Sequence, residues 1–241
     1  MQIIQSTLLK NFTNITHGFT SRKNGNIAFH VGDDSRHVET NHDNLAKVLF
    51  YKKRTLVHMK QIHSDIVHVV NNEDNFLLPK ECDALITNKK DIPLMVMVAD
   101  CSPILFYDEN KKVIAVAHAG RQGAFKNIVK NTITTMAKEF GSKAQDIYVS
   151  VGASIGKCCY EVGSEIYDEA KKLNLEYSLE KRVNSYYLDI SKILKKQLLA
   201  CGIGEKNIEI SKECTCCLSN KYYSYRAQAK TGRFAGIIML K

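Results

Sequence analysis

The sequence has no long apolar segment. No stretch approaches the roughly 18 apolar residues that a membrane-spanning helix needs. The N-terminus, Met1–Ser6, has no basic region followed by an apolar one, so we expect neither export nor membrane insertion and predict a cytoplasmic protein. Prolines are few, namely Pro79, Pro93 and Pro103, and no repeat or tract rich in Pro, Gly or Ser divides the chain. We therefore predict a single domain over residues 1–241.

Disulfides are also unexpected, because eight cysteines are too few to form a framework in a chain of 241 residues. In the cytosol these thiols should be reduced and available as metal ligands or nucleophiles. The net charge of +9 favours anionic partners such as phosphates, nucleotides or nucleic acid. The basic residues are scattered, however, and no nucleic-acid motif accompanies them, so we expect a solvated surface and no nucleic-acid partner. A basic binding module without enzymatic activity is the alternative, and its binding would weaken steeply with salt.

Short runs rich in apolar and β-branched residues predict strands. These runs are Thr55–Met59, Asp65–Val70, Leu94–Ala99, Ile104–Tyr107, Val113–Ala117, Ile147–Val151 and Gly236–Leu240. Helical patterns cover Asn44–Lys53, Gly123–Phe140, Ser164–Leu173 and Ser191–Cys201. The second of these carries an apolar stripe of Phe125, Ile128, Val129, Ile133, Met136 and Phe140. Strands mixed with amphipathic helices predict an α/β fold in which helices cover the faces of a sheet.

Residues capable of chemistry stand where predicted strands end or begin. Cys101 follows the apolar run Leu94–Ala99, and His118 follows Val113–Ala117, with Gly120 permitting a tight turn after it. His63 comes just before another predicted strand. Because ligands gather at strand ends in open α/β sheets, these side chains could share one site. One Cys and two His match the usual zinc ligands, and three protein ligands leave a fourth position for water or substrate, as in catalytic sites.

Other interpretations of the same three residues stay open. Taken singly, Cys101 could be a small core residue, His63 a surface histidine and His118 a residue that caps a turn. Cys101 could also be a thiolate nucleophile with His118 as its base and Asp100 or His63 orienting that base, which would make the protein a Cys-His hydrolase. Metal content separates the two enzymes, because the hydrolase needs no stoichiometric metal and should be blocked by alkylation of Cys101.

A rival site is offered by Cys158-Cys159 and by Cys214-Thr215-Cys216-Cys217, which contains one Cys-x-x-Cys spacing. A structural zinc held by four thiolates is conceivable there. Adjacent cysteines in an extended segment point in opposite directions, however, and the chain has no second Cys-x-x-Cys. We therefore predict that these cysteines pack in the core or support another site.

Several short segments match a known family in order along the chain, from about Thr16 to Leu240. They are Gly18–Arg22, His30–Asp34, Gln61–His63, Cys82–Thr87, Ala99–Pro103, Ala117–Gly120, Ile155–Gly163, Tyr223–Arg226 and Thr231–Gly236. With these segments the chain resembles the multicopper polyphenol oxidase or laccase-domain family, which is associated with purine nucleoside phosphorolysis. The same family is also called the peptidoglycan-editing-factor family.

The resemblance implies a three-layer α/β/α fold with a mixed central sheet. It also implies that the metal is bound by His63, Cys101 and His118, with zinc as the metal and copper as a possibility. The implied function is a purine nucleoside phosphorylase that cleaves adenosine, inosine or methylthioadenosine with phosphate, with adenosine deamination as a second activity. Phosphorolysis needs cations near the ribose, and our candidates are Arg22 and Arg226, each of which could instead form a surface ion pair or brace the fold.

Two further activities stay open as alternatives. A peptidoglycan-precursor editing enzyme is one, and a copper-dependent polyphenol oxidase is the other. A single three-ligand site lacks the several coppers that the reduction of oxygen to water requires. The sequence also departs from the family pattern, because Arg121-Gln122-Gly123 stands where Trp-Arg-Gly is typical and Gly152–Gly156 lacks the usual proline. With Arg121-Gln122 in place of the family's Trp-Arg, we expect the phosphate or base pocket to differ from that of the family. The Arg22 segment also lacks the usual paired glycines.

Overall fold

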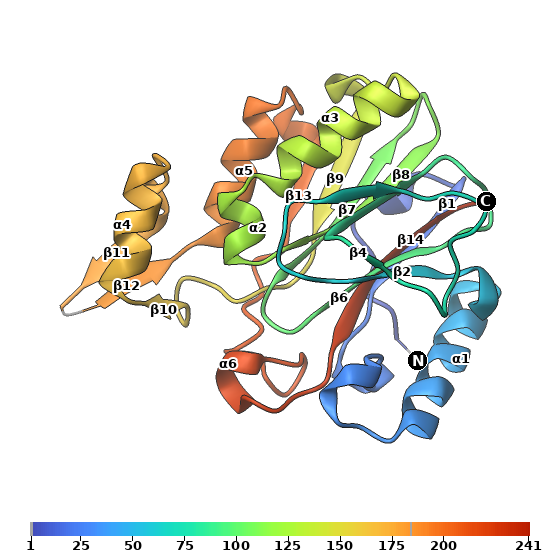
Figure 1. Ribbon diagram of the computed structural model, residues 1–241, viewed down its shortest axis with the longest axis horizontal. Helices are drawn as coiled ribbons and strands as arrows, with labels where there is room; N and C mark the ends of the chain where they lie inside the picture. The colour runs from blue at the N-terminus through green and yellow to red at the C-terminus, as the bar shows by residue number, and fades with distance from the viewer. Residues whose placement is uncertain (1, 184) are drawn as a thin grey trace.

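Two mixed sheets form the centre of the molecule (Figure 1), and the computed structural model describes residues 2–183 and 185–241. In spatial order, the first sheet contains β1 (Ile15–Phe19), β14 (Phe234–Leu240), β6 (Leu94–Val98), β2 (Val57–Lys60) and β4 (Lys80–Glu81). The second contains β13 (Ile208–Ile210), β9 (Ile147–Val151), β7 (Ser102–Asp108), β8 (Val113–Ala119), β5 (Ala84–Thr87) and β3 (Val67–Val69). Each sheet mixes parallel and antiparallel pairs, as β6 runs parallel to β2 but antiparallel to β14.

The two sheets pack face to face, because their central strands are apolar on both sides. In β6, Leu94, Val96 and Val98 point into the core shared with the second sheet, whereas Met95 and Met97 pack in a separate core with α1 (Ser35–Leu49). This alternation follows from the two-residue period of a strand. Each buried face therefore needs its own cover, either the other sheet or a helix.

The outer face of the second sheet is covered by α2 (Arg121–Phe125), α3 (Ile128–Phe140) and α5 (Ile190–Ala200). Figure 1 shows α3 and α1 on opposite sides of the sheets. The predicted α/β fold of helices around mixed β-structure is thus confirmed, and the central β-layer is double. The predicted single domain over residues 1–241 includes residues 1 and 184, which lie outside the described residues.

All the predicted strands are present, as β2, β3, β6, β7, β8, β9 and β14. The helix predicted over Gly123–Phe140 is broken near its start, because Asn127 adopts a φ of 63° and its side chain accepts a hydrogen bond from the backbone N–H of Lys130. The apolar stripe of that segment faces the second sheet as predicted. The predicted helix at Asn44–Lys53 is part of α1, which starts earlier and ends at Leu49, where Phe50 is left-handed.

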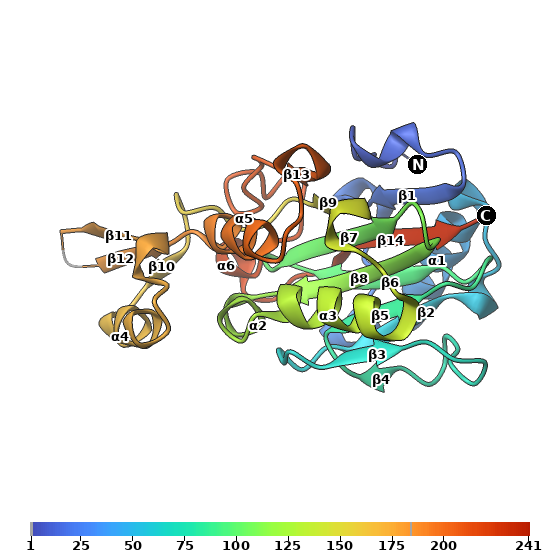
Figure 2. The same cartoon turned by 90° about the horizontal axis from the view of Figure 1, so that it is seen from above.

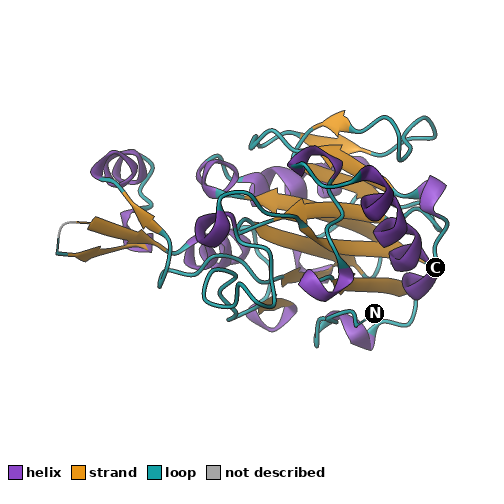
Figure 3. Cartoon of the chain, turned by 90° about the horizontal axis from the view of Figure 1, so that it is seen from below, coloured by secondary structure: helices purple, strands orange, loops and turns teal. Residues whose placement is uncertain are grey.

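A small arm projects from one end of the two sheets (Figures 1 and 2). It consists of β10 (Glu161–Val162), β12 (Ser185–Leu188) and β11 (Leu179–Arg182), with α4 (Ser164–Lys172) alongside. Figure 3 shows the arm as a separate strand-and-helix unit next to the main body. The short α6 (Tyr225–Gln228) precedes β14. Among the described residues, no helix combines the length and the apolar character needed to cross a membrane.

Candidate metal centre

The three predicted metal ligands lie together at one edge of the sheets. His63 comes from the loop between β2 and β3, Cys101 directly precedes β7, and His118 is the penultimate residue of β8. The antiparallel pairing of β7 with β8 sets Pro103 opposite His118, which brings the Cys101 thiol close to this imidazole. One ligand atom from each residue lies within 4.8 Å of the other two. The side chains grouped by sequence reasoning are therefore grouped in space.

Gly120 is needed because the thiol sits directly against it. A Cβ at this position would lie 2.8 Å from Cys101 Sγ and 3.3 Å from His63 Cδ2. The φ of Gly120 is −78°, a value that any residue adopts. Glycine is therefore required here by the close approach of the thiol and not by the backbone conformation. Any larger residue here would push the thiol or the His63 ring out of place.

Asp83 is the functional residue to which the sequence analysis gave no role. Its buried carboxylate accepts a hydrogen bond from His118 Nδ1 at 2.8 Å and others from the backbone N–H groups of His63, at 3.1 Å, and Ser64, at 2.6 Å. The bond from His118 holds the proton on Nδ1 and leaves Nε2 free to bind a metal. Asp83 directly precedes β5, whose pairing with β8 places it beside His118. Asp83 lies in Cys82–Thr87, one of the segments that carry the family resemblance, and this match was the sequence signal that pointed to it.

Two other polar side chains fix the loops that carry the ligands. Gln61 pairs with the backbone of Met97, donating to its carbonyl at 2.7 Å and accepting from its N–H at 2.9 Å, so the loop of His63 is tied to β6. Asp100 has a φ of 91° and directly precedes Cys101. Its carboxylate accepts hydrogen bonds from Thr215 Oγ1 at 2.6 Å and from the backbone N–H of Arg226 at 2.7 Å, which connects the Cys101 turn to the C-terminal loops.

The electrostatics of the site favour a thiolate. Burial alone would raise the pKa of Cys101, but the His118 charge and hydrogen bonds from His118 and His63 lower this pKa to about 6. Burial likewise opposes the charge on His118, but the thiolate and the Asp83 carboxylate raise its pKa to about 9. Hydrogen bonds from His118 and Ser64 overcome burial and lower the pKa of Asp83 to about 2. Without metal, Cys101 and His118 therefore form an ion pair, and metal binding must displace the His118 proton.

A cavity of about 830 Å³ opens beside the three ligands. All three ligands line it, together with the cationic side chains of Arg121, Arg226 and Arg233. Arg226, one of the two predicted anion ligands, donates to the carbonyl oxygens of Cys159 at 2.8 Å and Glu161 at 3.0 Å. Arg121 was noted in the sequence only as a departure from the family pattern, and neither it nor Arg233 was predicted as an anion ligand. A cavity that joins a soft metal site to three guanidinium groups can accept an anionic or phosphate-containing reactant.

Arg22, the other predicted anion ligand, lies elsewhere. Its guanidinium donates to the carbonyl oxygens of Ser219 and Tyr222 and to the side chain of Gln228, and it stacks 4.4 Å from the centre of the Tyr223 ring. Arg22 does not appear among the described residues that line the cavity. These contacts brace the C-terminal loops, and its role toward phosphate stays a prediction.

The second cysteine group is also brought together. Cys158, Cys159, Cys214 and Cys217 converge, and the first two occupy a turn in which the N–H groups of Cys159 and Tyr160 both donate to the carbonyl of Gly156. The premise that this segment is extended was therefore wrong. In a turn, adjacent side chains can face the same partner.

Comparison with known proteins gives a family for this fold and site. A family model described as "Multi-copper polyphenol oxidoreductase laccase" matches residues 11–241. The chain belongs to this family. A relative from Corynebacterium glutamicum, named a purine nucleoside phosphorylase, is 34% identical and aligns over 92% of this chain and 93% of its own. A second relative named a purine nucleoside phosphorylase, from Clostridium acetobutylicum, is also 34% identical and aligns over 92% of this chain and 91% of its own.

Two solved structures share this fold. The crystal structure of the hypothetical protein YfiH from Bacillus licheniformis has a TM-score of 0.90 and 29% identity, and covers 94% of this chain and 93% of its own. That of YlmD from Geobacillus stearothermophilus also has a TM-score of 0.90, with 27% identity and coverage of 95% and 93%. The family implies a metal, and the thiolate and imidazole donors of the candidate centre suit Zn²⁺ or copper.

Proposed function

We propose that the chain is a metal-dependent purine nucleoside phosphorylase that cleaves adenosine, inosine or methylthioadenosine with phosphate. The main support is that His63, Cys101 and His118 lie in the wall of a cavity that also carries three arginines. The names of the relatives from Corynebacterium glutamicum and Clostridium acetobutylicum support the reaction class. A cavity of about 830 Å³ is within the range that binds small molecules of nucleoside size.

The arginines of the cavity supply the positive charge that phosphate needs. In phosphorolysis a phosphate oxygen forms a bond to C1′ of the ribose while the C1′–N9 bond breaks. The electron pair of the C1′–N9 bond and a proton go to the purine. We assign phosphate binding to Arg226 and Arg233, since planar guanidinium groups match phosphate oxygens. A Zn²⁺ held by His63, Cys101 and His118 would supply Lewis acidity at the cavity wall. Asp83 keeps His118 in the tautomer that can bind it.

One reaction mixture tests this proposal. The metal-loaded protein is incubated with adenosine, with and without phosphate, and the products are separated by chromatography. We expect adenine and ribose 1-phosphate, formed only with phosphate, and no product from Cys101→Ser. Cys201→Ser is the matched control, because Cys201 does not line the cavity. Free ribose would indicate a hydrolase, and inosine would reveal the adenosine deamination that the family resemblance implies. If adenosine, inosine and methylthioadenosine all stay intact with phosphate, the proposal is wrong.

The role of Arg22 is decided by a single variant. If Arg22 binds phosphate, as predicted from the sequence, Arg22→Ala raises the KM for phosphate and leaves bound metal unchanged. If its contacts with Ser219, Tyr222 and Gln228 only brace the loops, the same variant lowers the melting temperature and leaves that KM unchanged.

A Cys-His hydrolase is the second candidate, and the hydrogen-bonded series of Cys101, His118 and Asp83 favours it. Burial raises the pKa of Cys101, but the charge and hydrogen bond of His118 outweigh burial and lower this pKa to about 6. This thiol is therefore ionised at neutral pH. Asp83 orients the His118 ring as the third member of a catalytic triad does. The two candidates differ in metal: activity that survives complete metal removal and is abolished by alkylation of Cys101 would support the hydrolase.

Copper-dependent phenol oxidation ranks below both. The cavity in the described residues carries a single centre of three ligands, and reduction of oxygen to water needs several coppers. The Cys101 ligand must also stay reduced, because an oxidised thiol cannot bind the metal. Thiols stay reduced in the cytosol, so we place the reaction in the cytoplasm.

A further inference from the structure

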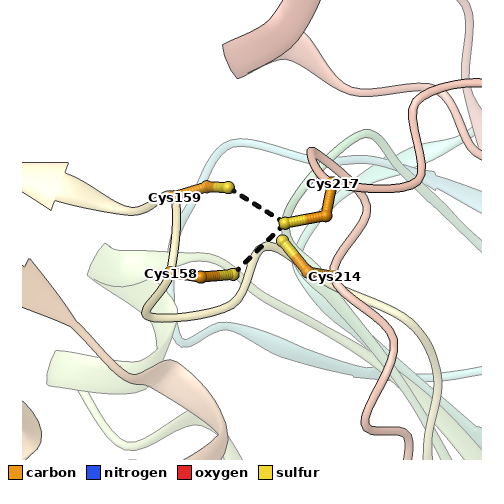
Figure 4. Close-up of side chains that lie close together, drawn as sticks. All are labelled: Cys158, Cys159, Cys214 and Cys217. Carbon is orange, nitrogen blue, oxygen red and sulfur yellow. Dashed lines mark hydrogen bonds between the residues drawn. The ribbon is translucent and has the colours of Figure 1, made fainter.

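A second group of metal-ligating side chains lies outside the cavity. Figure 4 shows Cys158 and Cys159 from one loop facing Cys214 and Cys217 from another. The four sulfurs all lie within 4.8 Å of one another, and all four cysteines are free thiols. Cys217 Sγ is 3.3 Å from Cys159 Sγ and 3.5 Å from Cys158 Sγ. None of the four is among the residues that line the cavity.

The backbone holds both loops in the positions that this convergence needs. The turn after Gly156 directs Cys158 and Cys159 toward the second loop, and the N–H of Gly156 donates to Cys214 Sγ at 3.2 Å. A larger residue at position 156 would require the neighbouring sulfur to move, because a Cβ there would lie 3.3 Å from Cys158 Sγ. Ser154 also pairs with Cys214 in a parallel bridge. The turn and the bridge between Ser154 and Cys214 thus place the two loops so that their sulfurs converge.

We propose that Cys158, Cys159, Cys214 and Cys217 bind a structural Zn²⁺ as four thiolates. In a tetrahedral zinc site with Zn–S bonds of about 2.3 Å, the sulfurs lie about 3.8 Å apart. The distances of 3.3 and 3.5 Å, and the limit of 4.8 Å for all pairs, bracket this value. Cys217 is near two other sulfurs at once, so one disulfide would satisfy only part of the group, whereas one tetrahedral ion contacts all four.

The zinc joins segments that are far apart in the chain. Between Cys159 and Cys214 the chain builds the arm of β10 to β12 and α4, and then α5 and β13. Closing this excursion with a metal restricts the unfolded chain and ties the base of the arm to the C-terminal loops. It also fixes one wall of the cavity, because Tyr160 follows Cys159 and Arg226 donates to the Cys159 carbonyl at 2.8 Å.

Metal counting on the whole protein tests the site. The chain is produced with zinc, purified under reducing conditions, and its zinc is measured by mass spectrometry. We expect about two zinc ions per chain, one in each of the two cysteine-containing centres. The double variant Cys158→Ser/Cys217→Ser should lose one zinc. Cys216→Ser should retain both, because Cys216 lies in the same loop but outside the group of four.

A cobalt spectrum provides a measurement that does not alter the four cysteines. Cys101→Ser breaks the cavity centre, so Co²⁺ added to this variant should report the four-cysteine group alone. We expect the intense sulfur-to-cobalt charge-transfer absorption of a tetrahedral tetrathiolate. The readout needs no nucleoside cleavage, so it stands or falls separately from the proposed function.

Three results would overturn the proposal. The first is a double variant with as much zinc as the wild type, and the second is a cobalt-loaded Cys101→Ser protein without the thiolate absorption. The third is iron in the four-cysteine group, or a disulfide within it, in protein purified under reducing conditions.

Discussion

Replacing Asp83 with asparagine tests how much the metal centre depends on a residue that supports the ligand His118 but is not itself a ligand. The substitution keeps the shape of the side chain but leaves only one acceptor oxygen where two now serve five donor contacts. If the amide nitrogen faces His118, the ring must either lose its partner or move its proton to Nε2, the atom needed for the metal. Loss of such a supporting carboxylate typically weakens metal binding by about 10- to 100-fold.

The same variant should also be less stable. The pKa of Asp83 is lowered to about 2 by hydrogen bonds from His118 and Ser64, which overcome the opposing effect of burial. A carboxyl that titrates about two units below its usual value contributes ~2 kcal/mol to the free energy of unfolding above about pH 4. This contribution is lost as the pH falls through about 2. At neutral pH we therefore expect Asp83→Asn to unfold more easily by ~2 to 3 kcal/mol.

Zinc titration against a competing chromophoric chelator at neutral pH measures the affinity, and denaturant unfolding measures the stability. Ser64→Ala is the matched control, since it removes one donor to Asp83 Oδ2 and leaves the carboxylate and its bond from His118 in place. We expect its zinc affinity to stay within about threefold of the wild type. An Asp83→Asn protein that is folded and binds zinc as tightly as Ser64→Ala would refute the role assigned to this carboxylate.

Three further outcomes follow from the geometry of the site. Gly120→Ala should weaken zinc binding by at least about tenfold, because its Cβ would lie 2.8 Å from Cys101 Sγ, and unchanged affinity in the same titration would contradict the close contact. Metal affinity should rise about tenfold per pH unit between about pH 6 and 9, where Cys101 is ionised and the proton on His118 must leave; a flat profile by chelator competition would exclude the ion pair. Arg226→Ala should raise the KM for phosphate by about tenfold or more with the cavity metal retained, and an unchanged KM would remove Arg226 from the phosphate site.

The sequence was sufficient to group Cys101 with His118 because each of these two residues stands next to a strand that is apolar throughout. Runs such as Leu94–Ala99 and Val113–Ala117 are short and apolar on both faces, which favours buried strands, so the polar residues after them were expected at a sheet edge. The turn of Cys101 and the end of β8 are also close in the chain. Their meeting therefore depends on one antiparallel pairing, between β7 and β8, which adjacent strands commonly form.

The parts that could not be predicted depend on pairings between distant segments. Asp83 supports His118 only because β5 pairs with β8, and nothing near Asp83 in the sequence reveals that register. The double β-layer depends on which face of β6 meets the second sheet, although the apolar run alone shows only that both faces are buried. The turn at Cys158-Cys159 is set by hydrogen bonds to Gly156, so its side chains could not be oriented from strand periodicity.

The central claim is that phosphate-dependent nucleoside cleavage depends on a metal held by His63, Cys101 and His118. The most direct measurement removes the metal with a chelator, returns Zn²⁺ in steps, and follows the release of adenine from adenosine with phosphate present. We predict that activity disappears with the metal, recovers as the cavity centre fills in the wild type, and does not recover in a folded Cys101→Ser protein. Full activity in the metal-free protein, or equal release of adenine without phosphate, would contradict the account.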